Sequence, residues 1–479
     1  MRLFMGLDVG TSAVKGVTIT EEGRIIAEAK RNVTFAKPQP GRFEIDPEDH
    51  YRSITGVISE MVTATRGSGK TAAVSMAAAS GNTLLLDTQN KPLTPIISWL
   101  DQRGMGKDDE LFPGFDFSNL HDIIGWPWVG MFPLAHLQWI KKNLPDTFER
   151  AGRVAMNLDY LSFRLTGNWM IDSSNATTFY LQDQKQRQWY KPYLNYVGIT
   201  EEQLPRIAEP GTSAGTITPA AAADTGLPED AQLVLGAFDH PCAARGTGNL
   251  EEGNVLLSCG TSWVGFYPVY DREKAVAMKL LIDPFLSPHG PWGAMFSIPA
   301  IAVNIDWYID TFIASEANKY DRFNALASEA RPGAGGLSIN PLIDPTSGDE
   351  TAREQVERVR QSSATNIARA VMEGAVFEMK KWIDKLDGEG FTAETITMVG
   401  GPSESPVWPQ ILSDATGLEL RLINGQTAGA YGAALLGAIG TGVFPGEEEA
   451  FSSLSGKPRI IYPQEALFKQ YQGLYNDKT

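Results

Sequence analysis

The chain opens on alternating apolar runs and polar turns, a pattern that predicts a β-meander. Leu3 to Leu7 form an apolar run that ends in a polar turn, Asp8 to Ser12, and Ala13 to Thr20 form a second run. Glu21-Glu22-Gly23 is a hairpin signal, and a third strand is expected from Arg24 to Ala29. The chain therefore begins with three consecutive strands rather than with a βαβ unit.

A long amphipathic helix is predicted after the meander. It begins in the segment Asp46-Pro47-Glu48-Asp49, which supplies an N-cap residue, a proline at the first helical position and acids in the first turn. Apolar residues then recur at helical spacing, at Tyr51, Ile54, Ile58, Met61 and Val62. Short buried strands are expected over Ala72 to Ser80 and Leu84 to Leu86.

The glycine-rich segment Ala64 to Thr71 is similar to a P-loop but lies in the wrong context. A P-loop follows a strand and opens a helix. This segment ends a helical pattern and precedes an apolar strand. We interpret it as a helix C-terminus followed by a turn.

The second half of the chain repeats a pattern from the first. Gly10-Thr11-Ser12-Ala13-Val14 recurs as Gly260-Thr261-Ser262-Trp263-Val264, and each copy follows an apolar run and leads into a strand. Later, a helix with apolar positions from Ile367 to Leu386 precedes a strand, Thr395 to Val399, which enters Gly400-Gly401. The small residues of Ala428 to Ala434 predict a helix that approaches a sheet closely.

Length and composition indicate a globular protein with two large domains. Domains commonly contain about 100–200 residues, and this chain has 479, of which 43% are hydrophobic and 20% charged. We place the boundary near Gly246 to Glu252, which divides the chain into residues 1–246 and 247–479. The net charge of −16 argues against nucleic acid or an anionic membrane as a partner.

Cysteine content and hydropathy indicate the compartment. The chain has two cysteines, too few for a disulfide framework, and no run of 18 apolar residues that would suggest a membrane span. Asp8 interrupts the first apolar run too early for a secretory signal. We expect a cytoplasmic protein, and a homodimer is compatible with the sequence.

The first glycine turn carries chemistry that suits a nucleotide and a metal ion. Asp8 stands at a strand end, where its carboxylate could serve Mg²⁺, while Gly10, Thr11, Ser12 and Lys15 offer backbone, hydroxyl and ammonium groups to the phosphates of a nucleotide. Two such turns facing each other would clasp one polyphosphate. The alternative is a solvated hairpin without a ligand.

A second acid is placed where a catalytic base would be useful. Asp239 follows the apolar strand of Leu235-Gly236-Ala237 and precedes His240, close to the expected domain boundary. Phosphoryl transfer needs a group that orients the incoming hydroxyl. The alternative for Asp239 is a helix N-cap.

Taken in order, these segments resemble the FGGY carbohydrate kinases. The segments that carry the resemblance are Asp8 to Lys15, Pro95 to Arg103, Asp159 to Gly167, Asp172 to Ala176, Gly236 to Gly246, Ser258 to Trp263 and Gly400 to Trp408. The resemblance implies an α/β fold of two actin-like ribonuclease H domains with an interdomain cleft. It also implies ATP with Mg²⁺, Asp239 as catalytic base, Gly260 and Thr261 in the second phosphate motif, and Gly401 and Ser405 near the adenosine.

The resemblance also implies a sugar pocket, and here the chain departs from the family pattern. Ser80, Gly81, Asn82, Trp99, Asp239 and His240 would border the sugar. Xylulokinases carry a Gln-Met-His-Gly segment, and the corresponding stretch of this chain is Ala78-Ala79-Ser80-Gly81-Asn82, so D-xylulose is not assumed. We predict ATP-dependent phosphorylation of a ketose, deoxyketose, aldonate or polyol. The alternative is a noncatalytic actin-like protein that binds nucleotide and senses sugar.

Overall fold

The computed structural model describes residues 1–260, 262–313, 318–423, 425, 427–452 and 458–476. The chain divides into two compact units, each assembled from separate stretches of sequence. Unit 1 comprises Met1–Leu250, Tyr270–Ala294 and Thr427–Ser455, and unit 2 comprises Glu251–Val269, Met295–Gln426 and Gly456–Thr479. No helix in the described part of the chain is both long and apolar enough to cross a membrane.

Unit 1 is an α/β unit that includes two returns of the chain from the second half. Its strands are β1 (Arg2–Val9), β2 (Ala13–Thr20), β3 (Ile25–Asn32), β4 (Glu44–Ile45), β5 (Lys70–Ala78), β6 (Leu84–Leu86), β7 (Ile96–Ile97), β8 (Arg153–Ala155), β9 (Met170–Asp172), β10 (Gln182–Asp183), β11 (Gln188–Trp189), β12 (Arg206–Ala208), β13 (Ser213–Thr216), β14 (Gln232–Val234) and β17 (Leu281–Asp283). Its helices are α1 (Pro47–Ala64), α2 (Asp108–Leu111), α3 (Leu120–Ile124), α4 (Pro133–Asn143), α5 (Pro145–Glu149), α6 (Asn157–Thr166), α7 (Ser173–Ala176), α8 (Lys191–Val197), α9 (Pro219–Thr225), α10 (Asp239–Thr247), α11 (Arg272–Ala277), α17 (Ala428–Gly440) and α18 (Glu447–Ser452).

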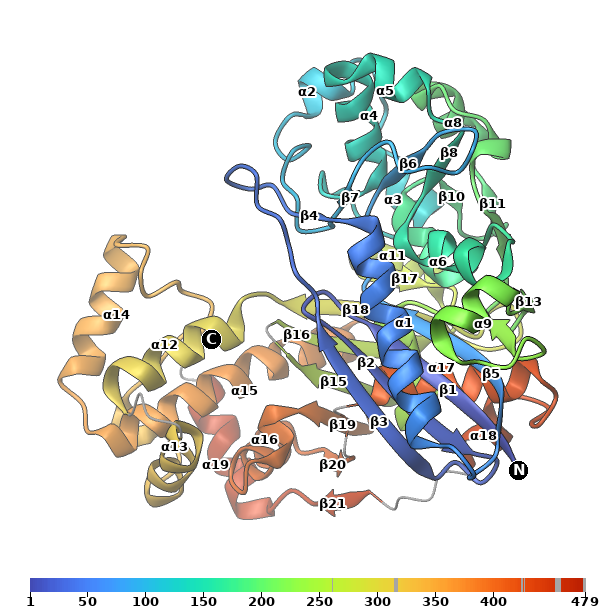
Figure 1. Cartoon of the computed structure of the whole chain (residues 1–479). Helices are drawn as coiled ribbons and strands as arrows, with labels where there is room; N and C mark the ends of the chain where they lie inside the picture. The colour runs from blue at the N-terminus through green and yellow to red at the C-terminus, as the bar shows by residue number, and fades with distance from the viewer. Residues whose placement is uncertain (261, 314–317, 424, 426, 453–457, 477–479) are drawn as a thin grey trace. The chain divides into compact units, whose positions relative to one another are not determined.

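Unit 2 has fewer strands and longer helices. Its strands are β15 (Asn254–Cys259), β16 (Trp263–Val269), β19 (Thr395–Gly400), β20 (Glu419–Leu422) and β21 (Arg459–Ile461), and β18 (Trp292–Ile298) runs across the division between the units. Its helices are α12 (Ile301–Phe312), α13 (Lys319–Glu329), α14 (Glu350–Arg360), α15 (Ala364–Gly388), α16 (Trp408–Thr416) and α19 (Glu465–Asn476). Figure 1 shows α16 and α19 beside the strands β20 and β21.

The sheet of unit 1 confirms the predicted meander. Its six strands follow the order β13-β14-β5-β1-β2-β3. β1, β2 and β3 are antiparallel neighbours, whereas β5 runs parallel to both β1 and β14. The parallel strands therefore bring their carboxyl ends to one edge of the sheet, which is where open α/β sheets usually bind ligands.

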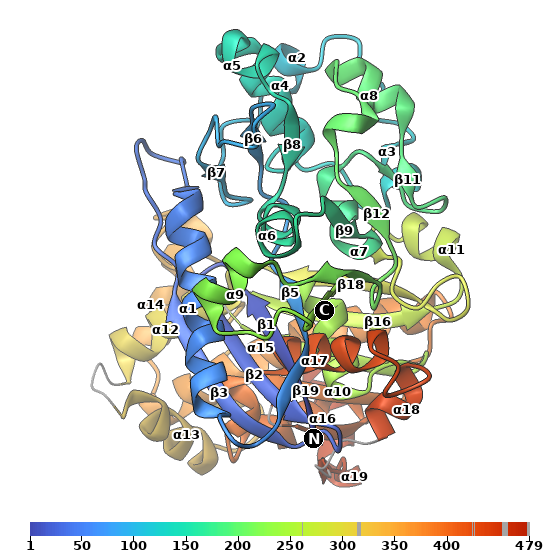
Figure 2. The ribbon, with the colours of Figure 1, turned by 45° about the vertical axis from the view of Figure 1, so that its right-hand side comes forward.

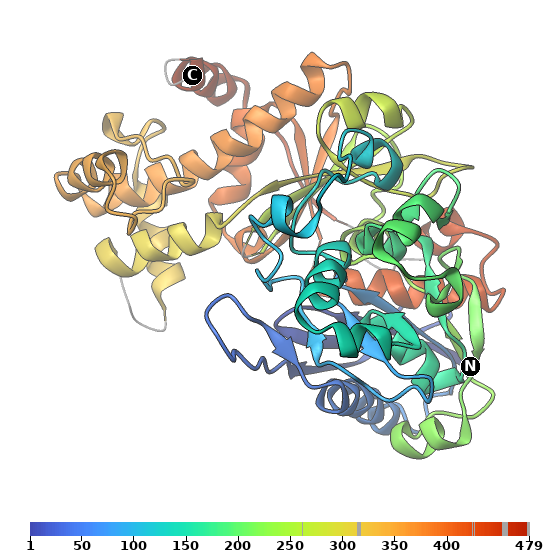
Figure 3. The same ribbon diagram turned by 90° about the horizontal axis from the view of Figure 1, so that it is seen from above.

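The predicted first helix is also confirmed, together with its cap. Asp46 Oδ1 accepts hydrogen bonds from the backbone N–H groups of Glu48 and Asp49, each at 2.9 Å, and so satisfies N–H groups that lack partners inside the helix. Figures 1 and 3 show α1 lying along the strands β2 and β3. The P-loop-like segment follows α1 as its C-cap and a turn, as predicted.

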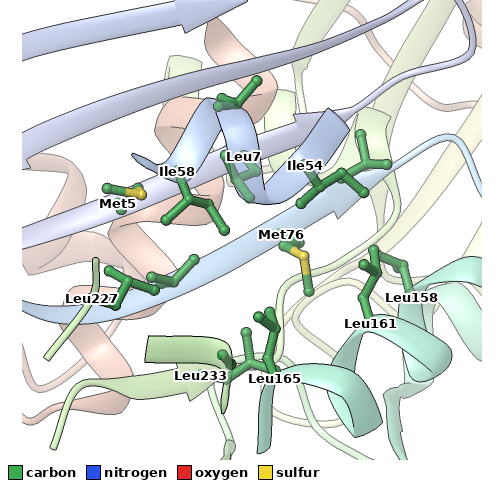
Figure 4. Close-up of a cluster of buried hydrophobic side chains, with 14 of the residues drawn as sticks. Met5, Leu7, Ile54, Ile58, Met76, Leu158, Leu161, Leu165, Leu227 and Leu233 are labelled. Carbon is green, nitrogen blue, oxygen red and sulfur yellow. The ribbon is translucent and has the colours of Figure 1, made fainter. Parts of the chain in front are cut away.

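The apolar face of α1 closes the main core of unit 1. Figure 4 shows Ile54 and Ile58 of this helix beside Leu7 of β1. Leu161 and Leu165 of α6 belong to the same buried cluster. Each of these five side chains is fully excluded from solvent, so this core fixes how β1 is placed in the unit.

Helix α17 covers another part of this sheet at very short range, as its small residues predict. A Cβ atom added to Gly6 of β1 would lie 1.8 Å from the carbonyl oxygen of Ala430. A Cβ atom added to Gly432 would lie 1.9 Å from the carbonyl oxygen of Cys242 in α10. Only glycine therefore fits at Gly6, where β1 faces α17, and at Gly432, where α17 faces α10. Figure 2 shows α17 beside β1 and α10.

Unit 2 repeats the strand pattern of unit 1. β15 is antiparallel to β16 and parallel to β19, as β1 is antiparallel to β2 and parallel to β5. The two turns differ in length, however. Val9 pairs with Val14, whereas Cys259 pairs with Trp263, so the second turn is one residue shorter. The recurring Gly-Thr-Ser sequence therefore stands at the same strand junction in both units, but the two turns differ in length.

Candidate active site

Three predicted site segments of unit 1 meet at the carboxyl edge of its sheet. Asp8 stands at the end of β1, level with Ala77 of β5. Beyond β5, Ala78 forms a parallel bridge with Phe238, the residue before Asp239. Asp8, the loop that starts at Ser80 and Asp239 therefore follow three neighbouring chain segments that run in the same direction.

The two carboxylates influence each other electrostatically. Burial raises the pKa of Asp8 to about 7, and the negative charge of Asp239 adds to this rise. Lys15, which pairs with Asp8 across β1 and β2, opposes it. A site with this charge balance favours the binding of a cation next to Asp8.

The first glycine turn is closed by its own backbone. The Gly10 N–H donates to the carbonyl oxygen of Ala13 at 3.1 Å. The Ser12 carbonyl accepts the Val33 N–H at 3.0 Å, while the side chain of Ser12 is exposed. The Gly10 N–H is therefore committed to the turn, and the exposed part of the turn lies at Thr11 and Ser12.

Trp99 links the predicted sugar segment to this turn. Its indole Nε1–H donates to Thr11 Oγ1 at 3.0 Å. The segment is anchored by Asp101, whose buried carboxylate accepts hydrogen bonds from Arg103 Nε at 2.7 Å and from the Phe43 N–H at 2.8 Å. The Asp101–Arg103 pair thus supports the position of Trp99 from within the fold.

Asp239 opens helix α10, and Phe238 is the N-cap residue. Asp239 Oδ1 accepts the His240 N–H at 2.8 Å, and the Asp239 side chain keeps 28% of its surface exposed. His240 is also partly exposed, with its Nε2 3.9 Å from Asp239 Oδ1. Asp239 is thus an acidic residue in the first turn of a helix, a position that acidic side chains commonly occupy.

The loop of Ser80, Gly81 and Asn82 is buried and already hydrogen-bonded within the protein. Ser80 Oγ is hydrogen-bonded to Thr178 Oγ1 at 3.1 Å. The Asn82 amide exchanges two hydrogen bonds with Asn157, one at 2.8 Å and one at 3.0 Å. The sequence brings these residues to the correct edge of the sheet, but the side chains of Ser80 and Asn82 retain little surface for a ligand.

Gly81 lies beneath an aromatic ring. A Cβ atom at Gly81 would lie 2.5 Å from the ring of Phe132, and the residue has φ +89°. Phe132 in turn stacks on Tyr180, with ring centroids 5.0 Å apart. Aromatic side chains of this chain therefore occupy the space over Gly81.

Unit 2 contains a cavity of about 490 Å³ at the carboxyl edge of its own sheet. Three predicted nucleotide residues, Gly260, Gly401 and Ser405, line it together. Among the described residues, a Cβ atom at Gly401 would meet no atom within 4 Å, and one at Gly260 would meet only the Ser262 carbonyl, at 3.6 Å. Both glycines therefore leave open space toward the cavity. Thr261, also predicted here, lies outside the described residues.

The cavity has an aromatic wall and a polar rim. Trp408 lies between Trp263 and Phe323, with ring centroids 5.5 and 5.9 Å away. Ser405 Oγ donates to Asn324 Oδ1 at 2.7 Å and accepts the Trp408 N–H at 3.1 Å. This combination of apolar surface and a few placed polar groups is typical of small-molecule sites.

Several lining residues were missed by the sequence analysis. Asp306 lies on α12, and Tyr320 and Asn324 lie on or beside α13 in a part of the chain without a motif. Tyr320 Oη donates to Asp306 Oδ1 at 2.8 Å, so these two side chains are coupled at the cavity. No local pattern distinguishes them from ordinary polar positions on a helix.

Comparison with known families decides what these two units are. The N-terminal domain of the FGGY family of carbohydrate kinases matches residues 3–246, and the C-terminal domain matches residues 255–441. The chain belongs to the FGGY family of carbohydrate kinases. The predicted family and the predicted two-domain actin-like α/β fold are confirmed, and the chain is an ATP-dependent sugar kinase.

Individual relatives support the same assignment over the full chain. The xylulose kinase of Bacillus subtilis (strain 168) is 26% identical over 487 residues, covering 99% of this chain and 96% of the relative. The L-xylulose/3-keto-L-gulonate kinase of Escherichia coli (strain K12) is 26% identical over 485 residues, covering 98% and 95%. The crystal structure of xylulose kinase from Rhodospirillum rubrum superposes with a TM-score of 0.87 at 25% identity, covering 99% of this chain and 97% of that one. None of these matches supports the noncatalytic alternative.

Proposed function

We propose that this FGGY kinase uses Asp239 as the base that receives the proton of the attacking sugar hydroxyl. The observation that carries the proposal is the placement of Asp239 beside Asp8 at one sheet edge, where its charge raises the pKa of Asp8. The sugar oxygen forms a bond to the γ-phosphorus of ATP, the bond to the β-phosphate oxygen breaks, and the hydroxyl proton passes to the Asp239 carboxylate. The products are ADP and the sugar phosphate.

For Mg²⁺ we propose Asp8 as the protein ligand. Mg²⁺ is commonly bound by one or two carboxylates together with water and substrate phosphates. The raised pKa of Asp8 supports this role, because a cation there relieves the repulsion between the two carboxylates. When bound, the ion neutralises charge on the phosphates. Gly10, Thr11, Ser12 and Lys15 would contact the phosphates from the adjoining turn and strand.

Gly260, Thr261, Gly401 and Ser405 are our proposed contacts for the rest of the nucleotide. The open space at Gly260 and Gly401 supports close approach of a ligand to the backbone. The aromatic wall beside Trp408 would suit the flat face of a base.

The proposed acceptor is a hydroxyl of a ketose, deoxyketose, aldonate or polyol, bordered by Trp99, Asp239, His240 and the Ser80 to Asn82 loop. Internal hydrogen bonds at Ser80 and Asn82 support a substrate that makes few polar contacts with this loop. We therefore favour a substrate other than D-xylulose. D-xylulose or L-xylulose is the second candidate, because relatives that match nearly the whole chain are named xylulose kinase and probable L-xylulose kinase.

The test is the Asp239→Asn variant, with Asp230→Asn as its control. Asn keeps the shape of the side chain but does not accept a proton, so kcat should fall at least about 100-fold. Asp230 is an exposed acid of the same unit that pairs with Lys70, and its variant should keep the wild-type kcat. ADP release should be followed with a sugar panel. Wild-type turnover by Asp239→Asn on the best sugar would show that another group is the base.

A further inference from the structure

Ser174 is hydrogen-bonded to the backbone directly before the proposed base. Its Oγ accepts the Phe238 N–H at 3.0 Å. Phe238 is the N-cap residue of α10, and Asp239 is the first residue of that helix. The position of the Phe238 peptide therefore sets where the Asp239 side chain begins.

The hydroxyl hydrogen of Ser174 is committed to a buried acid. Ser174 donates to Asp283 Oδ2 at 2.6 Å, and Asp283 Oδ1 accepts the Phe285 N–H at 2.8 Å. Ser174 and Asp283 each keep only 1% of their surface exposed. Because an ionised acceptor forms a stronger hydrogen bond than a neutral one, Asp283 orients the Ser174 hydroxyl so that its lone pair faces Phe238.

A second contact ties the Asp283 segment to α10 itself. Arg245, which lies on α10, donates from Nη2 to the carbonyl oxygen of Phe285 at 3.0 Å. Arg245 is fully buried and also pairs with Glu447 of α18 at 2.9 Å. The segment that holds Ser174 is thus fixed to the same helix that Asp239 opens.

The same hydrogen-bond network extends to the Ser80 to Asn82 loop. Asn175 follows Ser174, and its N–H donates to Asp172 Oδ1 at 2.7 Å. The Asn175 carbonyl accepts from Thr178 Oγ1 at 2.8 Å, and the same hydroxyl contacts Ser80. Hydrogen bonds in a buried polar network rigidify it, since each broken contact leaves a polar group without water.

From these contacts we propose that Ser174 and Asp283 are positioning residues for Asp239. They touch neither reactant in this scheme. They hold the Phe238 peptide, and through it the carboxylate of Asp239, in the orientation that receives the hydroxyl proton. This inference rests on the proposed role of Asp239 as base.

The first test is Ser174→Ala, with Ser162→Ala as a matched control. Ser162 is an equally buried serine of unit 1 whose Oγ donates to the Asn168 carbonyl at 3.1 Å. Ser174→Ala loses two hydrogen bonds and Ser162→Ala loses one, so both melting temperatures should fall, and that of Ser174→Ala should fall further. Only Ser174→Ala should lower kcat, by about tenfold, with the KM values for ATP and sugar changed less than twofold.

The second test combines Ser174→Ala with Asp239→Asn. A residue that acts through Asp239 has nothing to position once the carboxylate is gone, so the double variant should match Asp239→Asn within about twofold. Independent tenfold losses in both backgrounds would overturn the inference. So would a wild-type kcat for Ser174→Ala while Asp239→Asn is inactive, and this outcome leaves the proposed function intact. An active Asp239→Asn variant overturns both.

If Ser174→Ala does not fold, Asp283→Asn takes its place in these tests. Asn keeps the shape of Asp283 but has one acceptor oxygen for two donors, the Ser174 hydroxyl and the Phe285 N–H. We expect kcat to fall at least about threefold, and the loss to vanish in the Asp239→Asn background. An unchanged kcat for folded Asp283→Asn would remove Asp283 and Ser174 from this role.

Discussion

Replacement of Gly432 by Ala tests how closely α17 packs on α10. The new Cβ atom would lie 1.9 Å from the Cys242 carbonyl oxygen, whereas ordinary contacts begin near 3.4 Å. The two helices would have to separate by about 1.5 Å. Rotation of a side chain cannot relieve this contact, because it joins a backbone carbonyl oxygen of α10 and a Cβ atom fixed to α17.

The expected loss follows from two opposing contributions. Overpacking of a core costs about 1–3 kcal/mol, and a backbone obstacle places this site near the upper value. Alanine in a helix interior regains about 1 kcal/mol relative to glycine. The net destabilisation of about 2 kcal/mol corresponds to a melting temperature about 3 °C lower for a unit of this size. The kcat should also fall, because α10 begins at Asp239.

Gly437→Ala on the same helix is the matched control. Its Cβ atom would lie 3.5 Å from the Ala73 Cβ and 3.7 Å from the Ser75 Cβ, which are ordinary contacts. This variant should keep the wild-type kcat and gain up to about 1 kcal/mol. Differential scanning calorimetry and an ADP-release assay measure both effects. Equal melting temperatures for the two variants would show that the helix contact is not as tight as the structure has it.

Three further predictions concern the nucleotide, acid stability and the sugar. Gly401→Val should fold normally, because a Cβ atom there meets nothing within 4 Å, and it should weaken ATP binding by at least about tenfold; unchanged affinity in calorimetry would contradict the cavity assignment. Burial lowers the pKa of His136 to about 3, so the stability that its neutral form contributes is complete above pH 6.5 and declines as pH falls toward 3. The advantage of wild type over His136→Asn in unfolding free energy should therefore shrink by about 2 kcal/mol between pH 7 and pH 5, and a constant difference would show that His136 is not buried as described. In a sugar panel another substrate should exceed D-xylulose in kcat/KM, and a highest value for D-xylulose would refute this.

Most of the secondary structure was predicted from local features of the sequence. The meander, the Asp46 cap and the strand before Gly400 each depend on a few consecutive residues, and all three are confirmed. Asp8 and Asp239 are found by the same reasoning, because each follows a strand. Their roles, like the boundary near Gly246, remain predictions.

Contacts between distant residues could not be predicted in the same way. Ser174 lies in a segment that carries the family resemblance, yet its significance depends on Asp283, which is 109 residues away. Asn324 lines the cavity of unit 2 from a helix whose pattern is that of any amphipathic surface helix. Periodicity predicts which face of an element is buried, but it does not identify the partner.

The position of α17 has a consequence for folding during synthesis. β1 ends at Val9, but the helix that covers it begins at Ala428, so β1 leaves the ribosome long before this helix is made. At about 5–20 residues per second, roughly 20–80 s pass between the two events. During that interval the apolar residues of the first sheet that pack against α17, among them Phe4, Val17 and Ile19, lack this helix. A fragment that ends at residue 250 would remain in this state permanently, and its yield in isolation should be low.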